Sequence, residues 1–357
     1  MEFVRRYFRP EQLRELSLVL LIVLIFLFFG SQIEGYFSPR IFNRVTSDVA
    51  IIAVVAIGET LVLLTKNYDL SVGSIVGLTA FFTGKILSFY PDTTLPIVAI
   101  LFAVGLGGVL GLLNGLIIAY GRVPSLIVTL GTLAIYRSIL VGFPAGTKNV
   151  VTHDLPEWIL NLGRTNLFSI GEFDIRPLVA VGLIMLIVFQ LVLSYTRFGR
   201  LLYAVGSNQE AAEIGGLPTQ RTVLTAFIMS GAIAGFGGFM YLVRYGDLTP
   251  AAAQGMELMV IAAAVVGGVS AFGGSGTMIG ALLGAILINL LQQSLLRWTV
   301  ISNFWVDALL GFLILVSVTI DSVFINRLRA VWVQRSFVEI GQGDEIQMGK
   351  EEGNHDA

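Results

Sequence analysis

Residues 97–119 read IVAILFAVGLGGVLGLLNGLIIA, an apolar run that is interrupted by a single polar side chain, Asn114. A helix needs about 20 mostly apolar residues to cross a hydrocarbon core of about 30 Å. This run is long enough to do so, and residues 16–30 and 177–193 form further long, mostly apolar runs. The stretch therefore predicts a membrane-spanning helix in a chain that has several of them.

The composition supports a polytopic membrane protein. The chain has 357 residues, of which 55% are hydrophobic and 13% charged, and its mean hydropathy is +0.83. A soluble domain is usually about 25% charged. We predict an all-α bundle of about ten transmembrane helices, some of them broken or re-entrant, over residues 1–335, and an acidic, disordered cytoplasmic tail over 336–357. The predicted spans are 15–30, 48–65, 70–89, 95–119, 124–142, 176–195, 222–244, 256–273, 275–296 and 304–320.

The distribution of lysine and arginine predicts the orientation. With both termini in the cytoplasm, about thirteen of these side chains lie inside and about seven outside. An even number of spans agrees with this arrangement. The long loop at about 196–221 is then cytoplasmic and the loop at about 143–175 is external.

Several classes of chemistry are excluded or disfavoured. The chain has no cysteine, and its two histidines, His153 and His355, lie far apart in a predicted loop and in the tail. We interpret both as surface histidines rather than metal ligands. The chain contains no G-x-x-x-x-G-K-[ST] loop for nucleotide and no Ser-His-acid set, and its net charge of −2 does not indicate nucleic-acid binding. We expect a non-catalytic chain that binds no cofactor and takes its energy from a partner or an ion gradient.

The cytoplasmic loop contains a predicted short helix. Ser207 followed by Glu210 is the pattern of a capping box, and Gly215 or Gly216 suits the left-handed residue that ends a helix. Ala211 and Ala212 would let such a helix seat closely in a groove. The segment is either a connector lying on the membrane or a rigid docking helix for a cytoplasmic motor.

Polar residues inside predicted spans are candidates for a translocation pathway, because burying charge in a membrane is costly. Each is alternatively a packing contact or an ion pair, such as Glu59 with Lys85 or Arg137. Asp69 and Ser71 precede a span, and we favour a capping role for Asp69; Glu257 suits similar structural work. The pathway candidates are Glu59, Asp69, Ser71, Asn114, Arg137, Asn289 and Asp307.

Glycine and internal similarity suggest how the helices pack. Gly231 with Gly235, and Ala234 with Gly238, place small residues four apart on one helix, which favours close packing within the chain over a dimer contact. Residues 107–115 resemble residues 280–289, five spans later. A duplicated five-span unit would explain that echo.

Four stretches together resemble the permease subunits of bacterial ABC importers of the ribose, rhamnose and autoinducer-2 type. They are NYDLSVGS at 67–74; Asn114-Gly115 with PSLIVTLGT at 124–132 and Tyr136-Arg137; the cytoplasmic loop just described; and ELMVIAAAVVGG at 257–268 with GGSG at 273–276. One departure is Met259, where the family often has aspartate or lysine. It leaves the role of that segment and the substrate subgroup open.

The resemblance implies import of a small sugar or sugar-like solute across the bacterial plasma (inner) membrane by alternating access. It implies a cytoplasmic ATPase subunit that binds ATP and Mg, an external or periplasmic solute-binding protein, and a second permease copy, identical or related, all set in membrane lipid. An ion-gradient-driven secondary transporter and a membrane scaffold without transport are the alternatives. The ATPase-coupling residues that the resemblance implies are Ser207, Asn208, Glu210, Ala211, Ala212, Gly215, Gly216 and Leu217.

Overall fold

The computed structural model describes residues 10–92, 94–142, 149–171 and 173–298, with 305, 308–309, 311–317 and 319. The chain divides into two compact units, Met1–Ile314 and Leu315–Ala357, and the description that follows concerns the first. The predicted tail at 336–357 lies outside the described residues. Within the predicted span at 304–320, the described residues 305, 308–309, 311–317 and 319 are helical.

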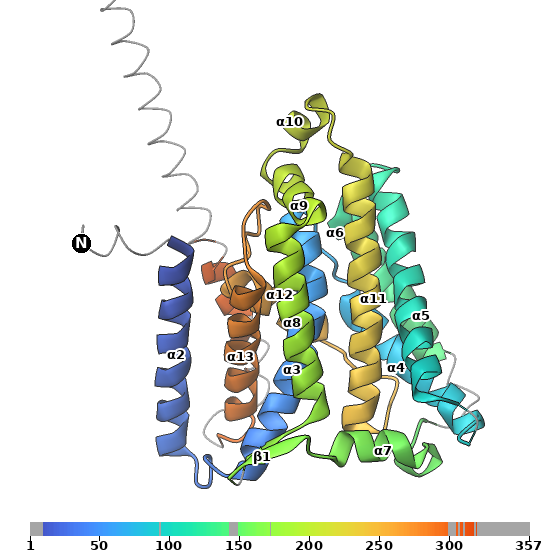
Figure 1. Cartoon of the computed structure of the whole chain (residues 1–357), viewed down its shortest axis with the longest axis vertical. Helices are drawn as coiled ribbons and strands as arrows, with labels where there is room; N and C mark the ends of the chain where they lie inside the picture. Colours follow the sequence, from blue (N-terminus) through green and yellow to red (C-terminus); the bar gives the residue numbers. More distant parts are fainter. Residues whose placement is uncertain are drawn as a thin grey trace, which may run out of the picture. The chain divides into compact units, whose positions relative to one another are not determined.

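Within the described residues, eight helices are long and apolar enough to cross a membrane. This confirms the predicted polytopic helical bundle (Figure 1). Proline at the first turn helps to start α3, α5 and α8, since its missing N–H is not needed there. The eight helices are α2 (Pro10–Gln32), α3 (Pro39–Leu64), α4 (Val72–Phe89), α5 (Pro96–Ala119), α6 (Ser125–Gly142), α8 (Pro177–Tyr195), α11 (Thr219–Tyr245) and α13 (Met278–Leu295).

The described parts of the two long loops contain helices and a hairpin and lie at opposite ends of the bundle (Figure 1). At one end, α9 (Arg197–Ser207) and α10 (Gln209–Ile214) connect α8 to α11. At the other end lie η2 (Thr152–Asp154), α7 (Glu157–Arg164) and an antiparallel hairpin of β1 (Phe168–Ile170) and β2 (Phe173–Ile175), in which Phe168 pairs with Ile175. We refer to these as the α9–α10 end and the α7–β1 end.

Glycine lets α5 and α11 approach until their backbones touch. A Cβ atom added to Gly107 would overlap the carbonyl oxygen of Gly231, and one added to Gly235 would overlap that of Ala103. Gly238, on another face of α11, would collide with Val76 and Thr79 of α4. The small residues of α11 therefore serve packing within the chain, which confirms the predicted choice over a dimer contact.

Helices from each half of the sequence pack on a helix from the other half. In the first half, α4 and α5 pack on α11 of the second half. In the second half, α12 (Met256–Val266) and α13 pack on α3 of the first half. This reciprocal pattern is what a duplicated and intertwined unit produces, and it fits the echo between residues 107–115 and 280–289.

The predicted span at 256–273 is wrong as a continuous helix. α12 has 11 residues, and at 1.5 Å per residue it covers about half of a hydrocarbon core. The chain beyond it turns at Gly268, Gly273, Gly274 and Gly276, all with positive φ. Glycine accepts this conformation without a steric penalty, so the run of glycines ends the helix early.

Two arginines from distant segments bind the irregular backbone on either side of α12. Arg137 of α6 donates to the carbonyl oxygens of Ala252 (2.7 Å) and Ala253 (3.4 Å), just before the helix. Arg14 of α2 donates to the carbonyl oxygens of Val265 and Gly268, both at 3.2 Å, at its C-terminal end. Non-helical backbone at membrane depth must be satisfied by protein or water, and these arginines supply part of that satisfaction.

The α5–α11 contact generates the first prediction. Gly107→Ala should lower the free energy of unfolding by about 1–3 kcal/mol, because the added methyl group overpacks a backbone contact. Gly105→Ala is the matched control on the same helix, since a Cβ there has no neighbour within 4 Å. Thermal unfolding in lipid nanodiscs should show a lower Tm for the first variant alone. Equal Tm values would mean that the two helices are not in close contact.

Candidate functional site

A buried chain of polar side chains begins at Glu59, on α3 (Pro39–Leu64). The turn that follows α3 folds back, so that the main-chain N–H of Asp69 donates to Glu59 Oε1 at 3.2 Å. Asp69 Oδ1 in turn accepts from the main-chain N–H of Ser71 (3.0 Å) and from its hydroxyl (2.6 Å). Asp69 therefore forms a turn with Ser71 just before α4 (Val72–Phe89). The N-cap of α4 is Ser71, and no side chain among the described residues caps this helix, so the predicted capping role of Asp69 is wrong.

The chain continues across two more helices. Asn114 of α5 donates through Nδ2 to Ser71 Oγ at 2.8 Å. Tyr136 of α6 donates to the carbonyl oxygen of Leu110 (3.1 Å) and reaches Asn114 Oδ1 at 3.4 Å. Glu59, Asp69, Ser71 and Asn114 have no exposed surface. Buried polar networks of this kind fix how elements pack, because each unpaired group would be costly.

Tyr68 holds the same turn against two other parts of the molecule. Its main-chain N–H donates to Ser125 Oγ at 3.1 Å, and its carbonyl oxygen accepts from Thr129 Oγ1 at 3.3 Å. Its hydroxyl donates to the carbonyl oxygen of Ala271 at 2.6 Å, in the glycine-rich turn after α12. The turn between α3 and α4 thus joins α6 to the α12–α13 connection.

The structure brings together four of the predicted pathway residues and separates the others. Glu59, Asp69, Ser71 and Asn114 form one buried cluster, whereas Arg137 binds backbone beside α12 and Asn289 is buried on α13. Asp307 lies outside the described residues. That these residues line a pathway stays a prediction.

The suggested ion pair of Glu59 with Lys85 or Arg137 is not formed. Arg137 donates to main-chain carbonyls, and Lys85 lies over the ring of Phe81, four residues before it on α4. The prediction that Ser207 caps the short helix of the cytoplasmic loop is also wrong.

The N-cap of α10 (Gln209–Ile214) is Asn208, whose Oδ1 accepts from the main-chain N–H of Ala211 at 3.0 Å. Ser207 is the last residue of α9, and its hydroxyl donates back to the Tyr203 carbonyl oxygen at 2.7 Å. Ser207 cannot cap α10 while it belongs to the preceding helix. Both Asn208 and Ser207 are favoured caps, so the sequence alone did not separate them.

The C-terminal end of α10 is closed by Gly216, which has a φ of +73°. The Leu217 N–H donates to the Ala212 carbonyl oxygen (2.9 Å) and the Gly216 N–H to that of Glu213 (3.0 Å). These two hydrogen bonds make a Schellman motif. The prediction that a left-handed glycine ends this helix is confirmed at Gly216.

α10 is anchored on one side and exposed at its tip. Ala212 is buried in an apolar cluster with residues of α3, α5, α6 and α11, and Leu217 packs against the same cluster. Ile214 is 84% exposed. The helix projects beyond the ends of the neighbouring helices (Figure 1). A rigid, capped helix with an exposed apolar tip is suited to bind another protein.

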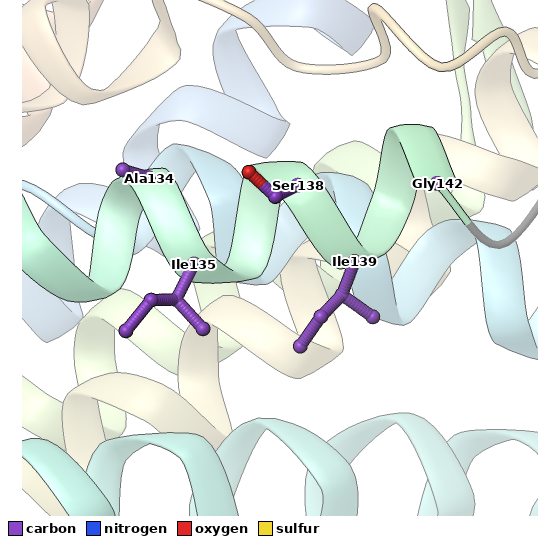
Figure 2. A pocket seen from close by; sticks show the side chains of 5 residues that line it. All are labelled: Ala134, Ile135, Ser138, Ile139 and Gly142. Atoms are coloured by element: carbon purple, nitrogen blue, oxygen red, sulfur yellow. The ribbon is translucent and has the colours of Figure 1, made fainter.

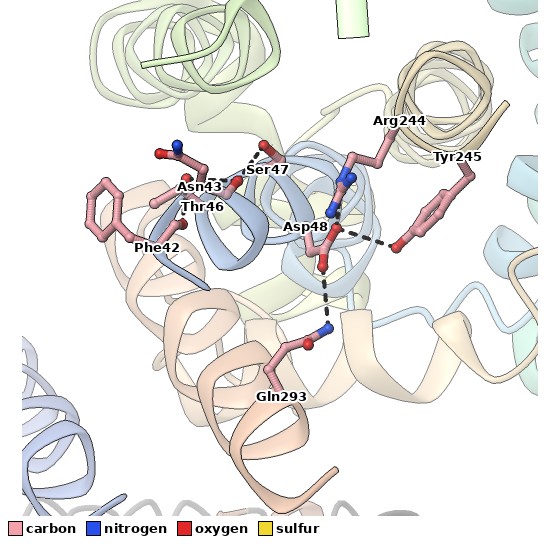
Figure 3. Close-up of polar contacts among 8 residues, drawn as sticks. All are labelled: Phe42, Asn43, Thr46, Ser47, Asp48, Arg244, Tyr245 and Gln293. Atoms are coloured by element: carbon pink, nitrogen blue, oxygen red, sulfur yellow. Dashed lines mark hydrogen bonds and ion pairs between the residues drawn. The ribbon is translucent and has the colours of Figure 1, made fainter. Parts of the chain in front are cut away.

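A second polar cluster lies near the α7–β1 end, and the sequence analysis missed it. Asp48 of α3 accepts from Arg244 Nε at 2.8 Å and from Tyr245 Oη at 3.3 Å, both on α11. Its other oxygen accepts from Gln293 of α13 at 3.2 Å (Figure 3). The available signal was an acidic residue at the edge of one predicted span and an arginine at the edge of another.

A further polar contact lies at the α7–β1 end, in the loop predicted to be external. Asp247 Oδ1 accepts from the main-chain N–H (2.7 Å) and the hydroxyl (2.8 Å) of Thr152. These hydrogen bonds hold the pKa of Asp247 below its usual value. The contact fixes the segment before α7 to the segment after α11.

The eight long apolar helices and the short helix α12 define a polytopic helical membrane protein. Residues 41–318 match the family described as "Branched-chain amino acid transport system / permease component". The match covers more than half of the chain, and the chain belongs to this permease family. This confirms the permease class to which the sequence motifs pointed.

Relatives with closely similar sequences carry a more specific name. The chain is 35% identical over 302 residues to the autoinducer 2 import system permease protein LsrC of Yersinia pseudotuberculosis serotype O:1b (strain IP 31758), covering 85% of this chain and 83% of the relative. It is 34% identical over 315 residues to LsrC of Yersinia enterocolitica serotype O:8, covering 88% and 84%. No solved structure matches the chain.

The buried polar chain generates the second prediction. Asn114→Leu should lower the free energy of unfolding by about 1–3 kcal/mol, because it leaves the buried Ser71 hydroxyl oxygen without the hydrogen bond that Asn114 donates. Asn289→Leu is the matched control, since Asn289 Oδ1 is buried without a hydrogen-bond partner. Denaturation in nanodiscs should give a smaller loss for Asn289→Leu, and the reverse order would contradict the network described here.

Proposed function

We propose that this chain is the membrane subunit of an ATP-driven ABC importer and that α10 is the element that binds the ATPase subunit. The observation that carries the second part is the form of α10. It is capped at both ends, anchored to the core by Ala212 and Leu217, and exposed at Ile214. Family membership supports the first part.

The chain itself would be non-catalytic. ATP and Mg would be bound and used by the partner ATPase, and the α9–α10 end would face the cytoplasm, as the positive-inside rule favours. Both termini would then be cytoplasmic. The α7–β1 end would face outward, where a solute-binding protein delivers the solute.

Contacts of α9 offer a route for movement from the ATPase into the bundle. Tyr203 Oη donates to the Gly276 carbonyl oxygen at 2.8 Å. The Gly274 N–H donates to the carbonyl oxygen of Leu64, the last residue of α3, at 3.1 Å. A displacement of α9 and α10 would therefore act on the end of α3 and on the α12–α13 turn together.

A second permease copy would complete the importer, and the outward face of α6 is suited to it. Ala134, Ser138 and Gly142 recur every four residues on this face, with Ile135 and Ile139 beside them (Figure 2). They line a shallow hollow of about 650 Å³. Small residues let membrane helices approach closely.

The solute is proposed to be a small sugar-like molecule of the autoinducer-2 class. The family description names branched-chain amino acids, whereas the similar relatives are named for autoinducer 2 import. At 35% identity over 85% of the chain, the relatives support the sugar-like class. Ribose and rhamnose belong to the same set of importers that the sequence motifs resemble.

The third prediction tests the ATPase contact. Ile214→Ala should weaken binding of the cognate ATPase subunit by about 2 kcal/mol, or about 30-fold, if Ile214 is buried on docking. Ile184→Ala, on the exposed face of α8, is the matched control, because Ile184 is 60% exposed. Co-purification from membranes and ATP hydrolysis in proteoliposomes provide the measurements.

Two results would contradict the proposal. One is an ATPase that binds both variants equally. The other is solute uptake that needs no ATPase and follows an imposed ion gradient, which would favour a secondary transporter.

A further inference from the structure

Two carboxyl groups meet in the interior next to the end of α3, and each has one oxygen without a partner. Glu59 Oε1 and Asp69 Oδ1 accept the hydrogen bonds described above, whereas Glu59 Oε2 and Asp69 Oδ2 accept none. Neither residue has any exposed surface. The cluster therefore contains two acidic groups whose free oxygens are cut off from solvent.

No described cationic side chain balances these two acids. Lys66 and Arg122 are exposed at the α9–α10 end, Arg137 binds main-chain carbonyls beside Glu257, and Lys85 lies over Phe81. α5 contains no charged residue. The nearby tyrosines are occupied as well, since Tyr136 donates to Leu110 and Tyr68 donates to Ala271.

The two acids have unequal support for a negative charge. Asp69 accepts two hydrogen bonds from Ser71 at the N-terminal end of α4, where the helix dipole favours an anion. Glu59 accepts a single main-chain hydrogen bond, from Asp69 itself. Two adjacent carboxylates repel each other, and an unpaired charge in a membrane interior is costly.

A cation must therefore compensate the pair, and the geometry favours a proton. Calcium and magnesium need about six or more oxygen ligands, whereas this site offers two free carboxylate oxygens. Among the described residues, no three His, Cys, Asp or Glu side chains come together. A proton needs only one oxygen and removes one charge.

We infer that the Glu59–Asp69 pair is a proton-binding site, in which Glu59 Oε2 carries the proton and Asp69 carries the negative charge. Loss of this proton would place two charges side by side and disfavour the folded-back turn at 65–71. That turn contacts Ala271 through Tyr68 and lies next to Gly273 through Lys66. Protonation is thereby linked to the same α12–α13 turn that α9 contacts. This inference does not depend on the proposed transport function.

Infrared spectroscopy of the full chain in lipid nanodiscs tests the site directly, because a protonated carboxyl group has a C=O stretch that a carboxylate lacks. Because Glu257 Oε2 is also buried without a partner, the test is made in the Glu257→Gln variant. We expect the band at neutral pH in this variant and its loss when Glu59→Gln is added. A Glu257→Gln variant without the band, or a band that persists in the double variant, would overturn the inference.

A stability measurement separates a proton from a metal ion. Glu59→Gln is a neutral mimic of protonated glutamate, so its Tm at neutral pH should match that of the wild type. On raising the pH to alkaline values, the Tm of the wild type should fall more than that of Glu59→Gln. A wild-type Tm that instead rises with added sodium at constant pH, with a loss of that response in Glu59→Gln, would assign the site to a metal ion and overturn the inference.

Discussion

The structure depends on the need to satisfy every backbone polar group without help from lipid. Straight helices meet this need by themselves, but the chain leaves helical geometry at 65–71, before α12 and after it. Side chains from distant segments bind these stretches: Arg137 and Arg14 at the two ends of α12, and Tyr68 and Tyr203 at the turns. Irregular backbone inside a membrane protein is stable only with such partners, so these contacts determine where the bundle can bend.

Close packing of the helices, rather than the hydrophobic effect, holds the bundle together, because lipid tails are as apolar as the side chains. α5 and α11 touch through Gly107, Gly231 and Gly235. The same device recurs where Gly284 of α13 lies against the carbonyl oxygen of Ala263 in α12. The first contact joins helices from the two halves of the sequence, and the second joins two helices of the second half, so glycine provides close packing both between the halves and within one of them.

Hydropathy was sufficient to predict most spans, because the length and polarity of an apolar run are local properties. It failed at 256–273, where apolar composition continues through a run of glycines whose positive φ values end the helix. The left-handed glycine after α10 was predictable for the same local reason. The partner of Asp48, the partners of Arg137 and the contact of Glu59 with Asp69 depend on tertiary packing, and no spacing in the sequence encodes them. Between Ser207 and Asn208, the N-cap was decided by where α9 ends.

The α9–α10 helix pair and the turn that contains Asp69 both contact the glycine-rich segment between α12 and α13. α9 reaches Gly276, the turn at 65–71 reaches Ala271, and Gly274 binds the last carbonyl of α3. Coupling between distant sites requires an element with two arrangements that both sites bias. The glycine-rich turn at 267–277 is in contact with both, because α9 binds it at Gly276 and the turn at 65–71 binds it at Ala271. A change in either place must therefore be accommodated by the same few residues, and this shared turn would link the proposed ATPase contact at α10 to the buried polar core.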